Sequence, residues 1–582
     1  MEQQRIFERP SGIFSVRSRI ASWCNGKNFN PQKLRGIILG ITLTATLGEV
    51  CSYKIIKQDI KAGELPSYLG DLMIIVFSIF EAIVAPFISW CGFRKRRTLL
   101  ISYTSAVTLT CVTWWFLPSK LERQESELCD AANSNNSVAF RGTSARSIIR
   151  LVIVIISCVA FVLSRVACWS HSVAYSDEYA PARASVHYGA LLISRVVPLV
   201  LGYKTLTGAI DDNMPLQTAG IVIGFLVNLI QLFFFVPKTV PIVDGIQRVA
   251  VPLHDRSFFM SVGRVLNNSV AMTQMFAMSL LAAALWGYGF NELDIVKVKY
   301  NLIPETNGLV QFTEILTYYF LAFVVAYFGV KFSAPILMEF CNLKAIKQTV
   351  ILSVLVFVLY IAMTTVRGCD TDNVVGLGKS YYGHPECSLS CNCKPQWDEF
   401  KPVCATDGMV TYISPCHAGC RDSEVINGIQ VYSNCTCAGA GAGAGAGRVL
   451  ERACGDASCR RAFRFHSMLF FITVTMSILV FQAQGVLLLR TVDPRDRSVV
   501  MGLMWSMIAI VTFVCGHSVF LGLRVATCGW LEAEKCHLQS QSFPYLVGAT
   551  SAFLTLTSIM TSITSWICIR TTDKVQSFES RL

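Results

Sequence analysis

The sequence predicts an all-α polytopic membrane protein with twelve transmembrane helices and one small, disulfide-rich extracellular domain. Three observations support this prediction. The 582 residues are 53% hydrophobic and 15% charged, with a mean hydropathy of +0.49, whereas soluble domains average about 25% charged residues. Apolar runs of membrane-spanning length recur along the chain, and eleven of the 23 cysteines fall between residues 367 and 464. Water cannot solvate so much apolar helix surface, so one membrane-embedded bundle is favoured over about three or four soluble domains.

Each predicted span is an apolar run long enough for a helix to cross the bilayer core, which takes roughly 20 residues. The first run is short and contains an acid, Glu49. The twelve runs are 36–53, 69–92, 98–117, 148–170, 186–203, 217–236, 266–287, 309–331, 346–366, 465–489, 499–523 and 545–569.

The basic residues predict the orientation of these spans. The formal net charge of +12 is gathered in short clusters between apolar runs, which fits membrane topology better than nucleic-acid binding. One side has the basic N-terminus and the connectors FRKRR (93–97), VPKTVPIVDGIQR (236–248) and RTVDPRDR (490–497). The positive-inside rule places this side, and both termini, in the cytosol, as an even number of spans requires. No cleavable signal peptide is expected, because the first apolar run follows a polar, basic segment without a small-residue cleavage site.

The spans and their orientation divide the chain into seven segments. Two are cytosolic termini, one is a cytosolic connection between two groups of six spans, and one is a long extracellular loop. They are 1–35 (N-terminus), 36–236 (spans one to six), 237–265 (cytosolic connection), 266–366 (spans seven to nine), 367–464 (extracellular loop), 465–569 (spans ten to twelve) and 570–582 (C-terminus).

The extracellular loop is predicted to be held together by disulfides, because it faces an oxidising compartment and has little core of its own. Zinc bound by Cys391, Cys393 and His417 is the competing interpretation, but the spacings fit no usual zinc motif. Because eleven is odd, one cysteine must stay free or pair outside the loop, with Cys528 and Cys536 as candidates. The loop cysteines are Cys369, Cys387, Cys391, Cys393, Cys404, Cys416, Cys420, Cys435, Cys437, Cys454 and Cys459.

Two further features of the extracellular side concern its surface. Asn135 and Asn434 head N-glycosylation sequons on this side. The repeat AGAGAGAGAG (438–447) has no side chains that could form a core and is expected to be a flexible spacer. Its period of two does not match a GxGxxG phosphate-binding loop.

Several stretches together resemble one family. PVCATDGMVTYISPCHAGC (402–420) and the later YSNCTC resemble a Kazal-type module, centred on about 387–437. Such a loop between the ninth and tenth of twelve spans is the hallmark of the organic anion transporting polypeptides. Further stretches that are similar to this family lie near span ends, at AYSDEYAPARASVHYGALL (174–192), FFFVPKTVP (233–241), SFFMSVGRVLNNSVAM (257–272), AQGVLLLRTVDPRDRSVVMG (483–502) and TCGWLEAEKC (527–536).

The resemblance implies a major-facilitator-like fold with two six-helix halves that rock about a central site. It also implies sodium-independent uptake of amphipathic organic anions, such as conjugated steroids, bile-salt-like or eicosanoid-like compounds and xenobiotics, in exchange for an intracellular anion. The chain departs from the family pattern in three places. The Kazal-like run has one residue more than usual between Cys404 and Tyr412. The tryptophan-rich signature of span six is reduced to LQTAGIVIGFL (216–226), and the usual arginine of span eleven is absent from SMIAIVTFVCG (506–516).

Four ionisable residues inside apolar spans are predicted to line a substrate pathway, because such groups at membrane depth face water or a partner. Arg165 and Arg195 are the clearest cations, and two of them facing a cavity would attract an anion; snorkelling or pairing with an acid is the alternative. Glu81 could pair with an arginine or take up a proton. Lys54 could serve the pathway or anchor a helix end at the headgroups. The resemblance places Arg165, Glu81 and Lys54 near charged family positions, the first two about one turn out of register.

Several histidines and acids admit a structural or a functional interpretation. His171, Asp177 and Glu178 could form a proton relay, but a polar helix end facing the cytosol is favoured. His517 could be a hydrogen-bonded histidine within the bundle or part of a gate, and the first is favoured.

Enzymatic function is not expected, and neither is a cofactor or a resident metal. The sequence contains no HExxH, GxSxG or GxxxxGK[ST] motif. The predicted partners are small organic anions and the lipid bilayer, and the predicted location is the plasma membrane. Two alternatives to transport remain: a surface protein that binds proteases through its Kazal-like loop, and a family member that has lost transport and serves as a receptor or scaffold.

Overall fold

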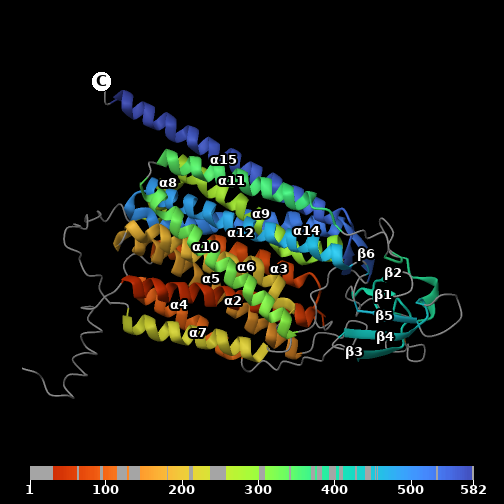
Figure 1. The fold of residues 1–582 in the computed structure, drawn as a ribbon. Coiled ribbons are helices and arrows are strands. Elements are labelled where there is room, and N and C mark those ends of the chain that lie inside the picture. Colours follow the sequence, from red (N-terminus) through yellow and green to blue (C-terminus); the bar gives the residue numbers. More distant parts are fainter. Residues whose placement is uncertain are drawn as a thin grey trace, which may run out of the picture.

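The computed structural model contains a long helical bundle with a small β-sheet domain beyond one end (Figure 1). It describes residues 31–61, 65–91, 96–114, 128–129, 145–179, 181–208, 214–235, 257–300, 308–339, 342–368, 374–376, 383–391, 393, 401–405, 410–426, 429–438, 447–451, 454, 456–532 and 535–579.

Long helices overlap each of the twelve predicted spans. Six precede residue 236, namely α2 (Pro31–Lys61), α3 (Leu69–Cys91), α4 (Arg96–Thr113), α5 (Ala145–Tyr179), α6 (Pro181–Gly208) and α7 (Met214–Phe235). The later ones are α9 (Ser269–Tyr300), α10 (Gly308–Glu339), α11 (Asn342–Thr365), α12 (Asp456–Thr491), the broken helix α13–η6–α14 (Arg497–Ile508, Ala509–Gly516, His517–Ala526) and α15 (Phe543–Glu579).

The lengths and composition of these helices are those of a multi-pass membrane protein. Within the described residues, eight helices are long and apolar enough to cross a membrane, and three shorter apolar helices accompany them. The first of the eight covers Leu34–Lys57, so the predicted span 36–53 ends about one turn too early.

The helix over predicted span eleven is interrupted, which the apolar run did not indicate. Its middle, Ala509–Gly516, is a π-helix, in which the hydrogen bonds of the α-helix are re-spaced. The Thr512 hydroxyl donates to the Ser279 carbonyl of α9 at 2.9 Å, which joins the break to a neighbouring helix. The short helix α8 (Phe258–Leu266) covers the end of the segment 237–265, for which the sequence predicted a connection.

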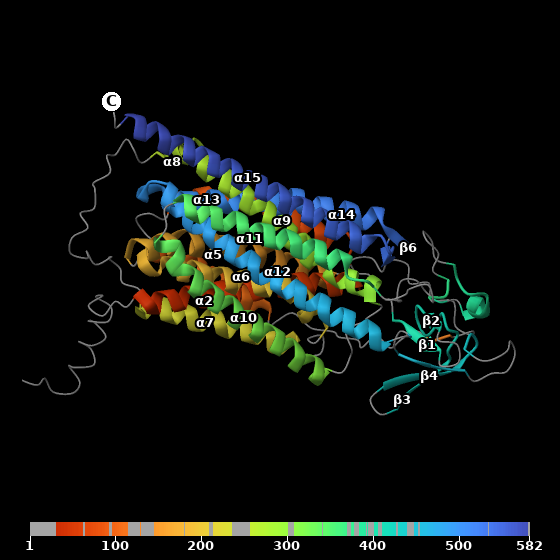
Figure 2. The same cartoon turned by 45° about the horizontal axis from the view of Figure 1, so that its top comes forward.

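The helices before and after residue 236 pack against each other along the bundle. α13 packs against α3 and α5, while α6 packs against α9, α10 and α12. One continuous apolar core runs through both groups. Figure 2 shows, as Figure 1 does, that the end of α15 lies at the opposite end of the bundle from the β-sheet domain.

The β-sheet domain, which we call the outer domain, contains a five-stranded antiparallel sheet in the order β2-β1-β5-β4-β3. Its central strand β5 comes from beyond residue 437, so the sheet extends past the predicted module at 387–437. The strands are β1 (Val403–Ala405), β2 (Val410–Tyr412), β3 (Asp422–Ile426), β4 (Ile429–Cys435) and β5 (Gly447–Leu450). A separate hairpin, β6 (Cys528–Glu532) with β7 (Lys535–Gln539), follows α14.

Disulfides connect the outer domain internally and to the bundle. Four join described cysteines within the loop, namely Cys387–Cys437, Cys393–Cys416, Cys404–Cys454 and Cys420–Cys435. A fifth joins Cys391 to Cys129, which lies in the segment between α4 and α5. The suggestion that a loop cysteine pairs with Cys528 or Cys536 is wrong, because these two close their own hairpin with a sequence separation of only 8. Cys369 and the Cys459 side chain lie outside the described residues.

The outer domain also contacts the second group of helices. A small apolar cluster joins Val374 and Ile413 of the domain to Val298 of α9 and Leu538 of β7. Together with the Cys129–Cys391 disulfide, this cluster attaches the domain to elements from both groups of helices.

Candidate functional site

Four charged residues from four helices meet inside the bundle, and we call them the charge cluster: Glu49 of α2, Glu81 of α3, Arg165 of α5 and Arg195 of α6. Arg165 is ion-paired to both acids, and its Nε donates to Glu81 Oε1 at 3.2 Å. Arg195 donates from Nη1 to Glu49 Oε2 at 2.5 Å and to the Thr46 hydroxyl at 3.3 Å. The two carboxylates therefore balance the two guanidinium groups.

The sequence brings α2 close enough to α5 for these contacts through a glycine. A Cβ on Gly48 would lie 2.5 Å from Cζ of Phe161, a fully buried ring of α5. Only glycine permits this separation, and Glu49 is the next residue along α2. The close approach thus positions the Glu49 carboxylate beside Arg165.

The two acids of the charge cluster differ in how much of each remains accessible. The Glu81 side chain is 3% exposed and bonds Arg165 with both oxygens. The Glu49 side chain is 17% exposed and divides its oxygens between the two arginines, which are 7% and 6% exposed. Burying four charges is tolerated only because each is paired.

An aromatic group extends the charge cluster to the second group of helices. The Arg165 guanidinium lies over the Trp505 ring of α13, with its carbon 5.6 Å from the ring centroid. Trp505 packs edge-on against Trp169 at a centroid distance of 5.1 Å, and Trp169 packs against Tyr188 at 5.8 Å. A cation over an indole face is attracted by the ring quadrupole, so this contact couples α5 to α13.

Two polar contacts between the groups of helices flank the charge cluster. Towards the outer domain, His517 Nε2 of α14 lies 3.2 Å from Asp71 Oδ1 of α3. Towards the other end, Arg497 of α13 is ion-paired to Asp177 of α5. Residues 497 and 517 are 20 positions apart on one broken helix, or about 30 Å at ~1.5 Å per residue. Trp505, which contacts the charge cluster, lies between them.

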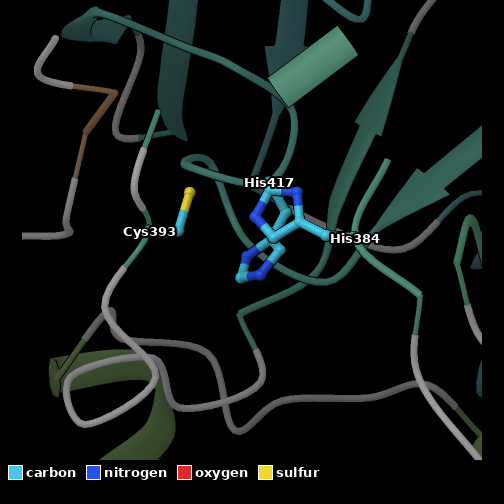
Figure 3. A group of neighbouring side chains, drawn as sticks. All are labelled: His384, Cys393 and His417. Carbon is cyan, nitrogen blue, oxygen red and sulfur yellow. The ribbon is translucent and has the colours of Figure 1, made fainter. Parts of the chain in front are cut away.

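A second group of potential ligands lies in the outer domain, where Figure 3 shows His384, Cys393 and His417 close together. Their ligand atoms lie within 4.8 Å of one another. Cys393, however, is bonded to Cys416, and Cys391 is bonded to Cys129, so neither offers the thiolate that zinc requires. The zinc interpretation of Cys391, Cys393 and His417 is therefore wrong for this structure. The His417 Nδ1 is instead 2.7 Å from the Ser414 hydroxyl.

The remaining polar groups of the outer domain contribute to its order. The Tyr412 hydroxyl donates to the Cys437 carbonyl at 2.8 Å, and burial raises the pKa of this tyrosine. Asn434 is exposed and has a positive φ of 61°, and its side-chain amide donates to Asp422 at 3.3 Å. Asn135 lies outside the described residues.

Comparison with known proteins decides the family. The model of the Organic Anion Transporter Polypeptide (OATP) family matches residues 247–545, which is just over half of the 582 residues. The chain belongs to the OATP family. The resemblance noted in the sequence is thereby confirmed at the level of the family, and the family is one of transporters rather than enzymes.

The curated relatives of this OATP chain are similar over a limited stretch. The solute carrier organic anion transporter family member 4C1 of Mus musculus is 26% identical over 186 residues, which is 30% of this chain and 25% of the relative. Member 1B1 of Homo sapiens is 27% identical over 207 residues, covering 32% and 28%. The matches thus span about a quarter of the relatives' length.

Among solved structures, this OATP chain is similar to the human organic anion transporter MFSD10 and to the nucleoside transporter NupG. Both have a TM-score of 0.46, at 11% and 8% sequence identity, and the alignments cover 91% of this chain and 99% or 100% of the other. Both similarities are too distant to bear on the function of this chain.

The structure of this OATP chain changes how the predicted site residues are understood. It brings Arg165, Arg195 and Glu81 together, and both arginines are ion-paired, which is the alternative of pairing with an acid that the sequence left open. Glu49 is the member of the charge cluster that sequence reasoning missed, although an acid in an apolar run is the signal that identified Glu81. Lys54 is buried about one and a half turns further along α2, and the three ion pairs of the cluster do not include it.

Two other expectations have clear outcomes. His171 is fully buried, with Nε2 3.2 Å from the Ile88 carbonyl, and Asp177 pairs with Arg497. His171 is therefore not part of a polar helix end facing solvent, whereas Asp177 lies two residues before the end of α5. The Glu178 side chain lies outside the described residues. The expectation that His517 is a hydrogen-bonded histidine of the bundle is confirmed by its contact with Asp71.

Proposed function

We propose that this chain is a sodium-independent transporter of amphipathic organic anions, acting by alternating access and in exchange for an intracellular anion. Membership of the OATP family supports the substrate class. The charge cluster supports the binding site, because it places two guanidinium groups side by side in the interior of the bundle. The pairing of Arg165 and Arg195 around one carboxylate is the single observation on which the proposal depends most.

The charge cluster offers both parts of an amphipathic anion a complementary surface. A guanidinium group presents a planar fork of N–H donors that matches the oxygens of a carboxylate or sulfate. The Trp505 ring lies next to Arg165, and Trp169 and Tyr188 pack behind it as fully buried rings. When the halves separate, Trp505 would provide aromatic surface for fused-ring substrates. We infer that conjugated steroids, bile-salt-like or eicosanoid-like anions and xenobiotics are the substrate class.

The two polar contacts that flank the charge cluster support the proposal of alternating access. The contact of Asp71 with His517 and the ion pair of Asp177 with Arg497 each join a helix of the first group to a helix of the second. If the two groups of six helices rock as rigid halves, opening either end breaks the contact at that end and leaves the other. The charge cluster would then be exposed to one side at a time.

The disulfides support an orientation for this cycle. Disulfides persist in oxidising compartments, so we place the outer domain outside the cell, with the basic connectors and both termini in the cytosol and the chain in the plasma membrane. In this orientation Asn434, and Asn135 if the segment 118–147 is outside, would be N-glycosylated. A tag-accessibility experiment on intact cells tests the orientation, which would be refuted by protection of the outer domain from an impermeant reagent.

The transport proposal is tested by uptake of a radiolabelled steroid sulfate into cells that express the full chain. We expect saturable uptake that persists when sodium is replaced by choline, and that is accelerated by preloading the cells with unlabelled substrate. Surface expression without uptake of any anion in a panel would refute transport and favour the receptor or scaffold alternative.

A further inference from the structure

Glu49 occupies the position in the charge cluster that the anionic group of a substrate would need. We propose that Glu49 is a built-in counter-anion, and that an organic anion binds by displacing its carboxylate from Arg165 and Arg195. The inference rests on the proposed function and adds a residue that sets the affinity and the release of the substrate.

The geometry of Glu49 is that of a bound anion. Its Oε1 accepts from Arg165 Nη1, and its Oε2 accepts from Arg195 Nη1 at 2.5 Å. One carboxylate thus spans two guanidinium groups that come from different helices. The oxygens of a substrate carboxylate, sulfate or sulfonate have the same acceptor chemistry, so they and the Glu49 carboxylate compete for the same donors.

The contrast with Glu81 shows which acid can leave. Glu81 bonds Arg165 alone, with both oxygens, and its side chain is 3% exposed. Glu49 is 17% exposed, so it is the less enclosed of the two acids. We therefore assign Glu81 to holding Arg165 in place, and Glu49 to the exchangeable position.

The arginines keep partners when Glu49 moves away. Arg165 retains its bonds to Glu81, and Arg195 retains the Thr46 hydroxyl at 3.3 Å. Displacement therefore leaves neither guanidinium without a polar neighbour during the exchange of one anion for another. If Glu49 stayed, the cluster would hold three anionic groups against two cations in a site of low dielectric constant, which is strongly unfavourable.

Displacement by the substrate has a kinetic consequence. While Glu49 covers the arginines, the binding-competent fraction of the protein is small, and the apparent affinity for the substrate falls by that fraction. The return of Glu49 opposes binding in the same way, so it promotes release. Removing the carboxylate should therefore lower KM and also lower the maximal rate, because the substrate leaves more slowly.

The experiment compares steroid sulfate uptake by the wild-type chain, Glu49→Gln and Glu49→Ala, normalised to surface protein. We expect KM to fall about tenfold in both variants, with a lower maximal rate. In Glu49→Ala the vacated space admits a small carboxylate, so acetate should compete with the tracer there and have no effect on the wild type. Glu49→Asp preserves the charge, and with it the balance needed for folding, but is too short to span both arginines. Its KM should lie between those of wild type and Glu49→Gln.

Glu81→Gln is the matched control, because it removes the same charge from the same cluster without freeing both arginines. We expect it neither to lower KM nor to make uptake sensitive to acetate. Saturable wild-type uptake with an unchanged or raised KM in the Glu49 variants, Glu49→Asp included, would overturn the inference alone. Absence of uptake by the wild type would overturn the proposed function and this inference together.

Discussion

Replacing Arg165 by methionine separates the structural part of the charge cluster from its part in transport. The change removes the donors to Glu81 and to one oxygen of Glu49. Glu49 keeps Arg195, but Glu81, at 3% exposure, loses its partner. Removing one member of a buried ion pair costs about 3–5 kcal/mol because the remaining charge is uncompensated. We therefore expect Arg165→Met to reduce both the stability and the surface amount of the protein.

The double variant Arg165→Met/Glu81→Gln should recover most of that loss. It removes one cation and one anion, so the remaining pair of Glu49 and Arg195 is balanced. Replacing a buried ion pair by uncharged groups of similar volume is often neutral or stabilising. Uptake should nevertheless remain at background, because the substrate has lost one of its two guanidinium groups.

The assay combines surface biotinylation, the melting temperature of the detergent-solubilised protein and uptake of labelled steroid sulfate per surface molecule. The single variant should melt well below the wild type, and the double variant close to it. If the double variant were as unstable as the single one, uncompensated charge would not be the cause of the loss. If the double variant transported normally, Arg165 would have no part in binding.

Three further changes test other contacts. Gly48→Ala places a methyl group 2.5 Å from Phe161, so it should lower the free energy of unfolding by about 1–3 kcal/mol and reduce uptake. Gly36→Ala on the same helix is the control, because its methyl group meets no atom within 4 Å, and this variant should melt like the wild type. At Gly419 the φ is +70°, and an added Cβ would lie 1.9 Å from Thr436, so Gly419→Ala should disrupt the outer domain. Immunoblots should then show that the variant is retained in the secretory pathway, and normal maturation would contradict this. Cys129→Ser leaves Cys391 with a free thiol, and maleimide labelling of intact cells should detect it in the outer domain. Absence of labelling would refute the Cys129–Cys391 disulfide.

The helices were predictable from the sequence, but their irregularities were not. Apolar runs identify helices because the membrane requires their backbone groups to be satisfied internally. The π-helix at Ala509–Gly516 leaves this composition unchanged, and it depends on a contact of Thr512 with another helix. Likewise, the cysteines predicted disulfides by composition and compartment. Their connections, above all Cys391 with Cys129 across 262 residues, depend on which loops the bundle brings together.

Three of the four members of the charge cluster were predictable from the sequence, but Glu49 and the balance of charge were not. Intramembrane charge is costly, and that cost identified Arg165, Arg195 and Glu81 one by one. Whether such groups face a cavity or each other depends on helix rotation and packing, which a single sequence does not specify. Glu49 lies in the run that fitted a membrane span least well. Its charge makes that run less apolar, and the same charge makes it the centre of the cluster.

The attachment of the outer domain to both groups of helices is compatible with the proposed rocking motion. The Cys129–Cys391 disulfide joins two segments outside the long helices, so it does not link one of these helices to another. Closure at this end must depend on non-covalent contacts, such as Asp71 with His517 and the edge-on contact of Tyr53 with Phe290 at 5.8 Å. Contacts of this size can be broken and remade in each cycle, whereas a covalent bond between the helices themselves would hold the outer end shut.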